Sequence, residues 1–289
     1  MRAILCHNPD SGDADHSKAE LLDALKRAGI EARYCSIKGD DFPGVLKEPA
    51  DVIIAAGGDG AVADIAKSMP DRGMPLVIVP LGTANYIARS FKIAGAAHDL
   101  AKGWDLSRWR PLDIGLVSGP WGERPFVEAV GLGPLPQVIL KKSGSEPTAK
   151  VGAGRDALRD EIAGADEIEA TLSIDGATIA TDDVLAIEIV NIAYTGPVLP
   201  LLEPGEKPRG TLGIAVIRRK ERAAMMSWLH APHSGRAPFS RFTGGRVELA
   251  WRGAKLRVDD QVMELPAGPQ QAIATIDGRS VKVLTQAGA

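Results

Sequence analysis

The chain has 289 residues, of which 45% are hydrophobic and 25% charged, and its formal net charge is −3 at pH 7. This is ordinary globular composition, long enough for two modest domains. The charge gives no general attraction to nucleic acid or to an anionic membrane, so no nucleic-acid partner is expected. No apolar run approaches the roughly 20 residues of a membrane span, and a cytoplasmic protein is expected.

Cysteine and histidine usage argues against a metal centre built from these residues. Cys6 and Cys35 are the only cysteines, too few for a disulfide framework, and both are expected to be buried small side chains in a reducing compartment. None of the five histidines forms a metal-ligand spacing with another, so no zinc site is predicted.

The first third of the chain alternates strand and helix signals. Strands are predicted at residues 3–6, 30–37, 52–56 and 76–79, and helices after Ser17, at 62–69 and at 86–91. Ser17 and Glu20 form a capping-box sequence, and Gly29 is expected to stop that helix. The alternation predicts an α/β domain with a parallel sheet and right-handed crossovers.

Polar or glycine-rich loops follow three of these strands where the strands end. The loops contain Asn8 to Gly12, Gly57-Gly58-Asp59-Gly60, and Gly82 to Asn85. Glycine lets the backbone approach a ligand closely, and a helix N-terminus aims free N–H groups at the same place. The pattern predicts a phosphate-binding edge of the sheet.

A strand-rich pattern begins near residue 111 and continues to the end of the chain. Period-two alternation at 170–174, 212–216, 247–251 and 272–276 predicts a β-rich sandwich or barrel-like domain, with helices at about 154–163 and 222–230. The predicted domains are residues 1–108, an α/β domain that carries the phosphate-binding edge, and 109–289, a β-sandwich domain. The last residues are allowed to return to the first domain.

The three loops, in this order and spacing, resemble the diacylglycerol kinase catalytic domain family, which includes bacterial lipid kinases and sphingosine kinases. Asp113-Ile114-Gly115, a turn at Val130 to Gly133, Asn191 and Ile276-Asp277-Gly278 match landmarks of the same fold. The resemblance implies an ATP-dependent transfer of phosphate to a lipid alcohol, with Mg²⁺ as cofactor. It also implies a cleft between the two domains as the active site.

Carried over residue by residue, the resemblance implies a set of nucleotide contacts and a smaller set of catalytic groups. Asp59 would orient phosphate or its Mg²⁺, while Asp277 or Asp59 would accept the proton of the acceptor hydroxyl and Arg279 would stabilise transferred charge. The implied nucleotide contacts are Asn8, Ser36, Gly57, Gly58, Asp59, Gly60, Ala61, Val62, Ala63, Thr83 and Asn85.

The chain departs from the family at acidic positions. Tyr86 and Leu135 stand where the family commonly has an acidic residue, and Arg209 and Gly213 stand in a motif associated with a structural Mg²⁺. Arg279 replaces the glutamate proposed as general base, and a guanidinium does not accept a proton near neutral pH.

Two interpretations of different class follow. The protein is an active lipid kinase, or it is a catalytically impaired member that binds nucleotide and regulates. NAD kinase is a third, less favoured reading, because the second half matches the lipid enzymes.

Two basic stretches suggest peripheral membrane contact. Lys141-Lys142 and residues 233–242 place cations beside aromatic residues in predicted loops, which would contact anionic lipid or simply be solvated loops.

Overall fold

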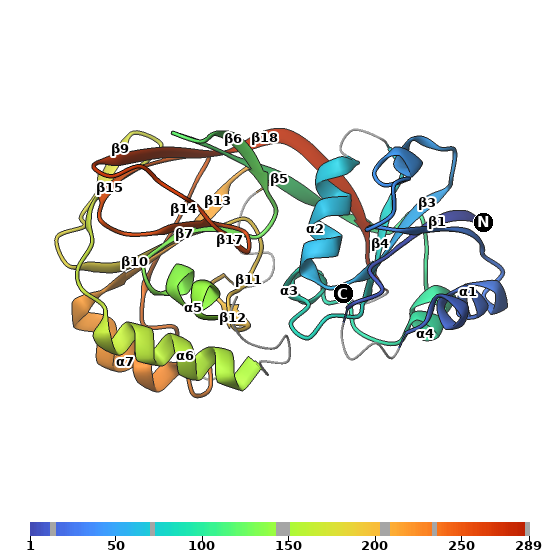
Figure 1. Cartoon of the computed structure of the whole chain (residues 1–289), viewed down its shortest axis with the longest axis horizontal. Helices are drawn as coiled ribbons and strands as arrows, with labels where there is room; N and C mark the ends of the chain where they lie inside the picture. Colours follow the sequence, from blue (N-terminus) through green and yellow to red (C-terminus); the bar gives the residue numbers. More distant parts are fainter. Residues whose placement is uncertain (12–15, 70–72, 143–150, 203–208, 233–235, 287–289) are drawn as a thin grey trace. The chain divides into compact units, whose positions relative to one another are not determined.

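A computed structural model describes the whole chain except residues 12–15, 70–72, 143–150, 203–208, 233–235 and 287–289 (Figure 1). The chain divides into two compact units. The first unit comprises Met1–Ile114 and Arg279–Ala289, and the second unit comprises Gly115–Gly278.

The first unit is built on a parallel sheet. Its strands are β1 (Arg2–His7), β2 (Glu31–Ser36), β3 (Val52–Gly57) and β4 (Leu76–Pro80). They pair in parallel in the order β2-β1-β3-β4. The whole of β3 is buried, because both faces of a parallel sheet are covered by helices. The predicted α/β sheet is confirmed.

Helices cover both faces of this sheet (Figure 1). They are α1 (Lys18–Arg27), α2 (Asp59–Ser68), α3 (Tyr86–Ser90) and α4 (Ala97–Lys102). The predicted capping box is present, with Ser17 and Glu20 bonded to each other's backbone N–H groups. Residues of α1 and α4, including Leu25 and Ala101, pack in one cluster with Ile54 of β3, while α2 covers the opposite face (Figure 1).

One long strand, β18 (Gln270–Leu284), contributes residues to both units. In the second unit it pairs antiparallel with β15 (Arg246–Arg252). In the first unit Val283 pairs with Leu76 of β4 in parallel. Strand β5 (Trp109–Gly119) also pairs with β18.

The second unit is a sandwich of two sheets. One face contains β5, β6 (Gly122–Phe126), β8 (Glu169–Ile174), β9 (Ala177–Ile179), β15 and β18. The other has the order β14 (Ser240–Gly244), β13 (Leu212–Arg218), β10 (Val184–Val190), β7 (Ala129–Leu132), β16 (Leu256–Val258) and β17 (Gln261–Val262). A short hairpin joins β11 (Tyr194–Thr195) to β12 (Leu199–Pro200). Phe126 and Val247 of the first sheet share one buried cluster with Ile187 and Ile214 of the second, and this confirms the predicted sandwich.

Three helices, α5 (Pro134–Lys142), α6 (Val151–Gly164) and α7 (Arg222–Trp228), cover the outer face of the six-stranded sheet (Figure 1). Their apolar residues, such as Leu158 and Trp228, pack with Ala186 and Ile217 of that sheet. Within the described parts of the chain, none of the helices combines the length and the apolar character that crossing a membrane would require.

Two local predictions are wrong in this unit. Lys141-Lys142 end helix α5 rather than lying in a loop, because Leu135 and Val138 supply a buried face at helical spacing. The predicted turn at Val130 to Gly133 is instead the buried strand β7 up to Leu132.

The second basic stretch is also only partly a loop. Residues 233–235 lie outside the described residues, and Ser240 begins strand β14. Phe239 is buried, with its ring centroid 5.6 Å from that of Trp228. Arg241 stacks over Phe239 and donates a hydrogen bond to the carbonyl of Pro200. Packing to the core thus holds much of this stretch.

Candidate active site

The three predicted loops of the first unit meet at the carboxyl ends of β1, β3 and β4. Backbone bonds join them: the N–H of Asn8 donates to the carbonyl of Ala56 (3.0 Å), and the N–H of Leu81 donates to the carbonyl of Gly57 (3.0 Å). The carboxyl edge of a parallel sheet is where ligands of such folds bind. The sheet therefore brings together residues far apart in the sequence.

Ser11 links the first loop to the second. Its Oγ accepts a hydrogen bond from the backbone N–H of Gly58 at 3.1 Å. Gly57 is closely surrounded, since a Cβ atom there would lie 2.7 Å from the Cβ of Ala61 and 3.4 Å from the Ser11 Oγ. Only glycine fits at position 57. The remaining member of the predicted first loop, Gly12, lies outside the described residues.

The third loop packs directly against the second. A Cβ atom on Gly82 would lie 2.6 Å from the Cα of Gly58, a backbone atom that cannot simply swing aside. The Asn85 backbone is left-handed, with φ of 51°. Its side chain bonds both backbone groups of Gly82, accepting from the N–H at 3.0 Å and donating to the carbonyl. The Asn85 side chain thus holds the third loop in its turned conformation.

Helix α2 begins at the glycine loop and presents backbone N–H groups there. Its N-cap is Gly58, which has no side chain to cap the helix. The first N–H groups of a helix have no partner within it and favour an anion. The side chains of Ala61, Val62 and Ala63 are buried in the core. Any contact of these three residues with a ligand is therefore through the backbone.

Asp59 connects the second loop to helix α3. Its Oδ1 accepts a hydrogen bond from the backbone N–H of Ile87 at 2.9 Å. Burial raises the pKa of the Asp59 carboxyl above its ordinary value, and backbone N–H groups of residues 85–87 oppose that rise. Asn85, the N-cap of α3, makes no side-chain cap bond. Asp59 supplies the carboxylate that caps α3.

The remaining predicted nucleotide contacts lie around the same edge. Gly60 and Thr83 are exposed to solvent. Asn8 Oδ1 accepts from the N–H of Asp10 (3.2 Å), and Ser36 Oγ accepts from the N–H of Lys38 (3.3 Å). An ion pair between Lys38 and Asp10 ties the loop after β2 to the loop after β1.

The other two predicted catalytic residues lie on β18. Asp277 belongs to the second unit and is half-buried. Gly278 follows with a positive φ of 83°, and Arg279 begins the return of the strand to the first unit.

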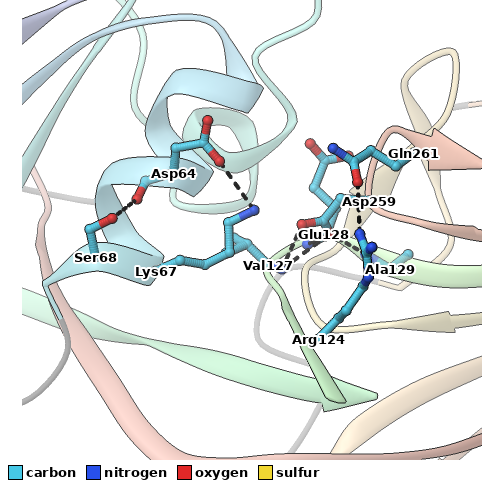
Figure 2. Close-up of polar contacts among 9 residues, drawn as sticks. All are labelled: Asp64, Lys67, Ser68, Arg124, Val127, Glu128, Ala129, Asp259 and Gln261. Carbon is cyan, nitrogen blue, oxygen red and sulfur yellow. Dashed lines mark hydrogen bonds and ion pairs between the residues drawn. The ribbon is translucent and has the colours of Figure 1, made fainter. Parts of the chain in front are cut away.

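A buried polar network in the second unit was not predicted from the sequence. Asp259, with φ of 51°, accepts bonds from the consecutive N–H groups of residues 127–129, the shortest at 2.8 Å to Glu128 (Figure 2). Arg257 donates to the Asp259 carbonyl, to Glu188 Oε2 at 2.6 Å and to Thr195 Oγ1 at 2.8 Å. Gly131 makes room for Glu188, because a Cβ there would lie 2.3 Å from the Glu188 Oε1.

Both charges of the central pair are almost fully buried, with Glu188 1% and Arg257 2% exposed. Burial raises the pKa of Glu188, and Arg257 opposes that rise. The carboxylates around Arg257 raise the pKa of its guanidinium despite burial. Isolated Arg and Glu residues in strand-rich sequence carry no signal that they will pair over 69 positions.

The structure shows the surroundings of three positions at which the chain departs from the family pattern. Leu135 lies on α5 and is buried in the cluster that this helix shares with α6 and the six-stranded sheet. Gly213 is packed under Leu202, whose Cδ1 would lie 2.3 Å from a Cβ at that position. Arg209 is exposed. Among the described residues no group of three or more His, Cys, Asp or Glu side chains is placed to hold a metal ion.

Comparison with known proteins shows which family the first part of the chain is similar to. Residues 2–117 match the family profile of the Diacylglycerol kinase catalytic domain. A diacylglycerol kinase of Bacillus subtilis (strain 168) is 32% identical over 149 residues, which are 47% of this chain and 47% of that relative. The match thus spans about half the length of the curated relative.

Solved structures resemble the full length of the chain. A diacylglycerol kinase from Bacillus anthracis str. Sterne superposes with a TM-score of 0.67 at 15% identity, covering 99% of this chain and 97% of the other. An NAD kinase from Archaeoglobus fulgidus in complex with ATP gives a TM-score of 0.54 at 13% identity, covering 99% and 94%. At these identities the likeness speaks for the fold alone. Over residues 2–117, where the three loops meet, the chain is similar to the diacylglycerol kinase catalytic domain family.

Proposed function

We propose that this protein is an ATP-dependent lipid kinase that transfers the γ-phosphate to the hydroxyl of an apolar alcohol, such as diacylglycerol or a sphingoid base. The observation that carries the proposal is the carboxyl edge of the first unit. There Ser11, Gly57, Gly58 and Gly82 hold three loops in contact around the start of helix α2. Phosphoryl transfer depends on such positioning and charge neutralisation more than on covalent chemistry.

The residues present at this edge fit the phosphates of ATP. Helix α2 offers backbone N–H groups without a capping side chain, and the glycines leave no Cβ between the backbone and a ligand. The exposed Thr83 lies on the loop that packs against Gly58, and we assign it a contact to the same nucleotide. Bound ATP supplies the phosphoryl group, while the chain holds it in place.

A metal ion would depend on the nucleotide for most of its ligands. No cluster of three acidic, His or Cys side chains is found in the described part of the chain, and Asp59 is engaged by backbone N–H groups. We infer that Mg²⁺ arrives with ATP, because this ion keeps several waters and is held by one or two carboxylates plus substrate phosphates.

The acceptor hydroxyl must lose a proton as its oxygen bonds to the γ-phosphorus and ADP leaves. Arg279 stands where the family has a base and cannot take that proton. The proton acceptor that we propose is Asp277 or Asp59, and Asp59 also accepts a backbone hydrogen bond as the cap of α3. Arg279 would then stabilise the transferred charge.

The alternative is a nucleotide-binding regulatory protein that transfers no phosphate. Two observations favour it: Arg279 at the family's base position, and the structural role of Asp59. The likeness to an NAD kinase concerns the fold alone and does not support that activity for this chain.

One assay separates these possibilities. Purified protein is incubated with γ-labelled ATP, Mg²⁺ and a panel of diacylglycerols and sphingoid bases in mixed micelles, and ATP affinity is measured in parallel. Labelled lipid supports the kinase, nucleotide binding without labelled lipid supports the regulatory alternative, and absence of both refutes the proposal.

The variant Arg279→Glu then tests the missing base. It should raise turnover if the base is limiting. No gain in an active enzyme would show that Asp277 or Asp59 suffices.

A further inference from the structure

Two exposed apolar side chains lie in one short segment of the first unit. Among the described residues only Met1, Leu106, Trp109 and Leu140 are large hydrophobic side chains with substantial exposure. Leu106 is 43% and Trp109 is 41% exposed, and they lie three positions apart where the chain enters β5. Single exposed apolar residues are common, but a pair in one segment requires an explanation.

Hydrogen bonds hold the turn that carries Leu106 and leads to Trp109. Leu106 lies in a turn closed by a bond from the N–H of Arg108 to the carbonyl of Asp105 at 3.0 Å. Ser107 donates its hydroxyl and its N–H to Asp105 Oδ1 at 2.6 and 2.9 Å. The carbonyl of Arg108 also accepts from the N–H of Thr285 at 3.1 Å. These bonds hold the turn, and it presents a leucine where turns usually place a polar residue or glycine.

Cations accompany the apolar pair. The Lys282 ammonium lies over the Trp109 ring, 5.1 Å from its centroid. Arg108 is exposed and forms an ion pair with Asp105 at 3.2 Å. Two cations therefore stand against one carboxylate. We define the Leu106–Trp109 surface as Leu106, Arg108, Trp109 and Lys282.

This combination suits the boundary of a phospholipid bilayer. Indole rings favour the headgroup level, aliphatic side chains enter the acyl region, and lysine keeps its charge near lipid phosphates while its stem contacts apolar groups. Among the described residues, neither of the two basic stretches singled out in the sequence presents two large exposed apolar side chains. Lys141 is paired with Glu161, and Arg241 is bonded to the carbonyl of Pro200 and stacked on Phe239.

We propose that the Leu106–Trp109 surface docks this protein on a phospholipid bilayer. The choice of a bilayer rests on the proposed function, because a long-chain lipid alcohol is presented to a kinase in a membrane. The excess of cations is small, so binding depends mainly on Leu106 and Trp109 and increases modestly with anionic lipid.

Vesicle binding tests the proposal without requiring catalysis. Full-length protein is sedimented with phosphatidylcholine vesicles, with and without phosphatidylglycerol. Leu106→Ser and Trp109→Gln should each lower the partition coefficient by about tenfold, and Lys282→Gln should lower it by about fivefold on anionic vesicles. Leu140→Ser is the matched control, because Leu140 is exposed to a similar extent (39%) in the second unit, and its binding should be unchanged.

A second readout locates the contact. Vesicles with brominated acyl chains should quench tryptophan fluorescence in the wild type, and Trp109→Phe should lose most of that quenching while the other four tryptophans remain. The proposal would be overturned if Leu140→Ser lost vesicle binding as much as Leu106→Ser does, or if Leu106→Ser bound vesicles as the wild type does. It would also be overturned if Leu106→Ser abolished dimerisation of the protein and left vesicle binding unchanged. Phosphorylation of a short-chain soluble acceptor reports separately on the proposed function, and it should be retained in Leu106→Ser.

Discussion

Replacement of Asp59 separates its structural role from any role in nucleotide binding. The carboxylate caps helix α3 through the N–H of Ile87 at 2.9 Å. Asp59→Asn keeps an oxygen that can accept this bond but removes the charge. Asp59→Ala removes both the bond and the charge. We therefore expect the two variants to differ in thermal stability, while a role of the charge in nucleotide binding would lower ATP affinity in both.

The magnitude follows from the bonds that are lost. A hydrogen bond to a charged group contributes about 1.5–3 kcal/mol, so Asp59→Ala should lower the melting temperature by about 3–12 °C. Asp59→Asn should cost about 1 kcal/mol or less, because one acceptor remains and a buried charge is removed. If the charge orients phosphate or its Mg²⁺, both variants should lose ATP affinity by about tenfold or more, equivalent to about 1.4 kcal/mol.

The pH dependence gives an independent check on this carboxyl. Its pKa in the folded protein is raised above the ordinary value of 3.8. The folded state therefore binds the proton more tightly than the unfolded state. The free energy of unfolding contributed by this group falls as pH rises from about 3.8 towards the folded pKa. Asp59→Asn should lack that decline.

Thermal unfolding monitored by circular dichroism and ATP titration by calorimetry measure these effects. Equal melting temperatures for Asp59→Asn and Asp59→Ala would refute the capping role. Wild-type ATP affinity and turnover in Asp59→Asn would exclude the charge from the nucleotide site.

Three further predictions concern contacts elsewhere in the chain. Gly82→Ala should lower ATP affinity by about tenfold or more, since its Cβ would lie 2.6 Å from the Gly58 Cα. Calorimetry should show a smaller loss of ATP affinity in Gly44→Ala, where nothing lies within 4 Å of an added Cβ. Equal losses of affinity in the two variants would contradict the loop contact. Arg257→Met should destabilise the protein by about 3–5 kcal/mol in urea unfolding by leaving Glu188 buried and unpaired, and adding Glu188→Leu should recover much of that loss; no recovery would mean that the pair is not the cause. Burial raises the pKa of the Cys6 thiol to about 12, so a thiol reagent at pH 8 should label Cys6 only after unfolding, and rapid labelling of the native protein would contradict its burial.

The sequence determined those features whose signals are local. A continuous apolar run predicted the buried strand β3, and Ser17 with Glu20 predicted the start of α1. The period-two pattern of the second half predicted the sandwich, because alternation places apolar residues on one face of each strand. The three loops followed because parallel strands end at a common edge.

Only the tertiary structure decided features whose partners are distant in the chain. Asp59 caps a helix 28 residues away, and Arg257 finds Glu188 across 69 residues, pairings that no local pattern encodes. The glycine loop shows the division clearly. The sequence supplied residues able to approach a phosphate, while the contact between Gly58 and Gly82 required the strand order to bring two chain segments within van der Waals distance.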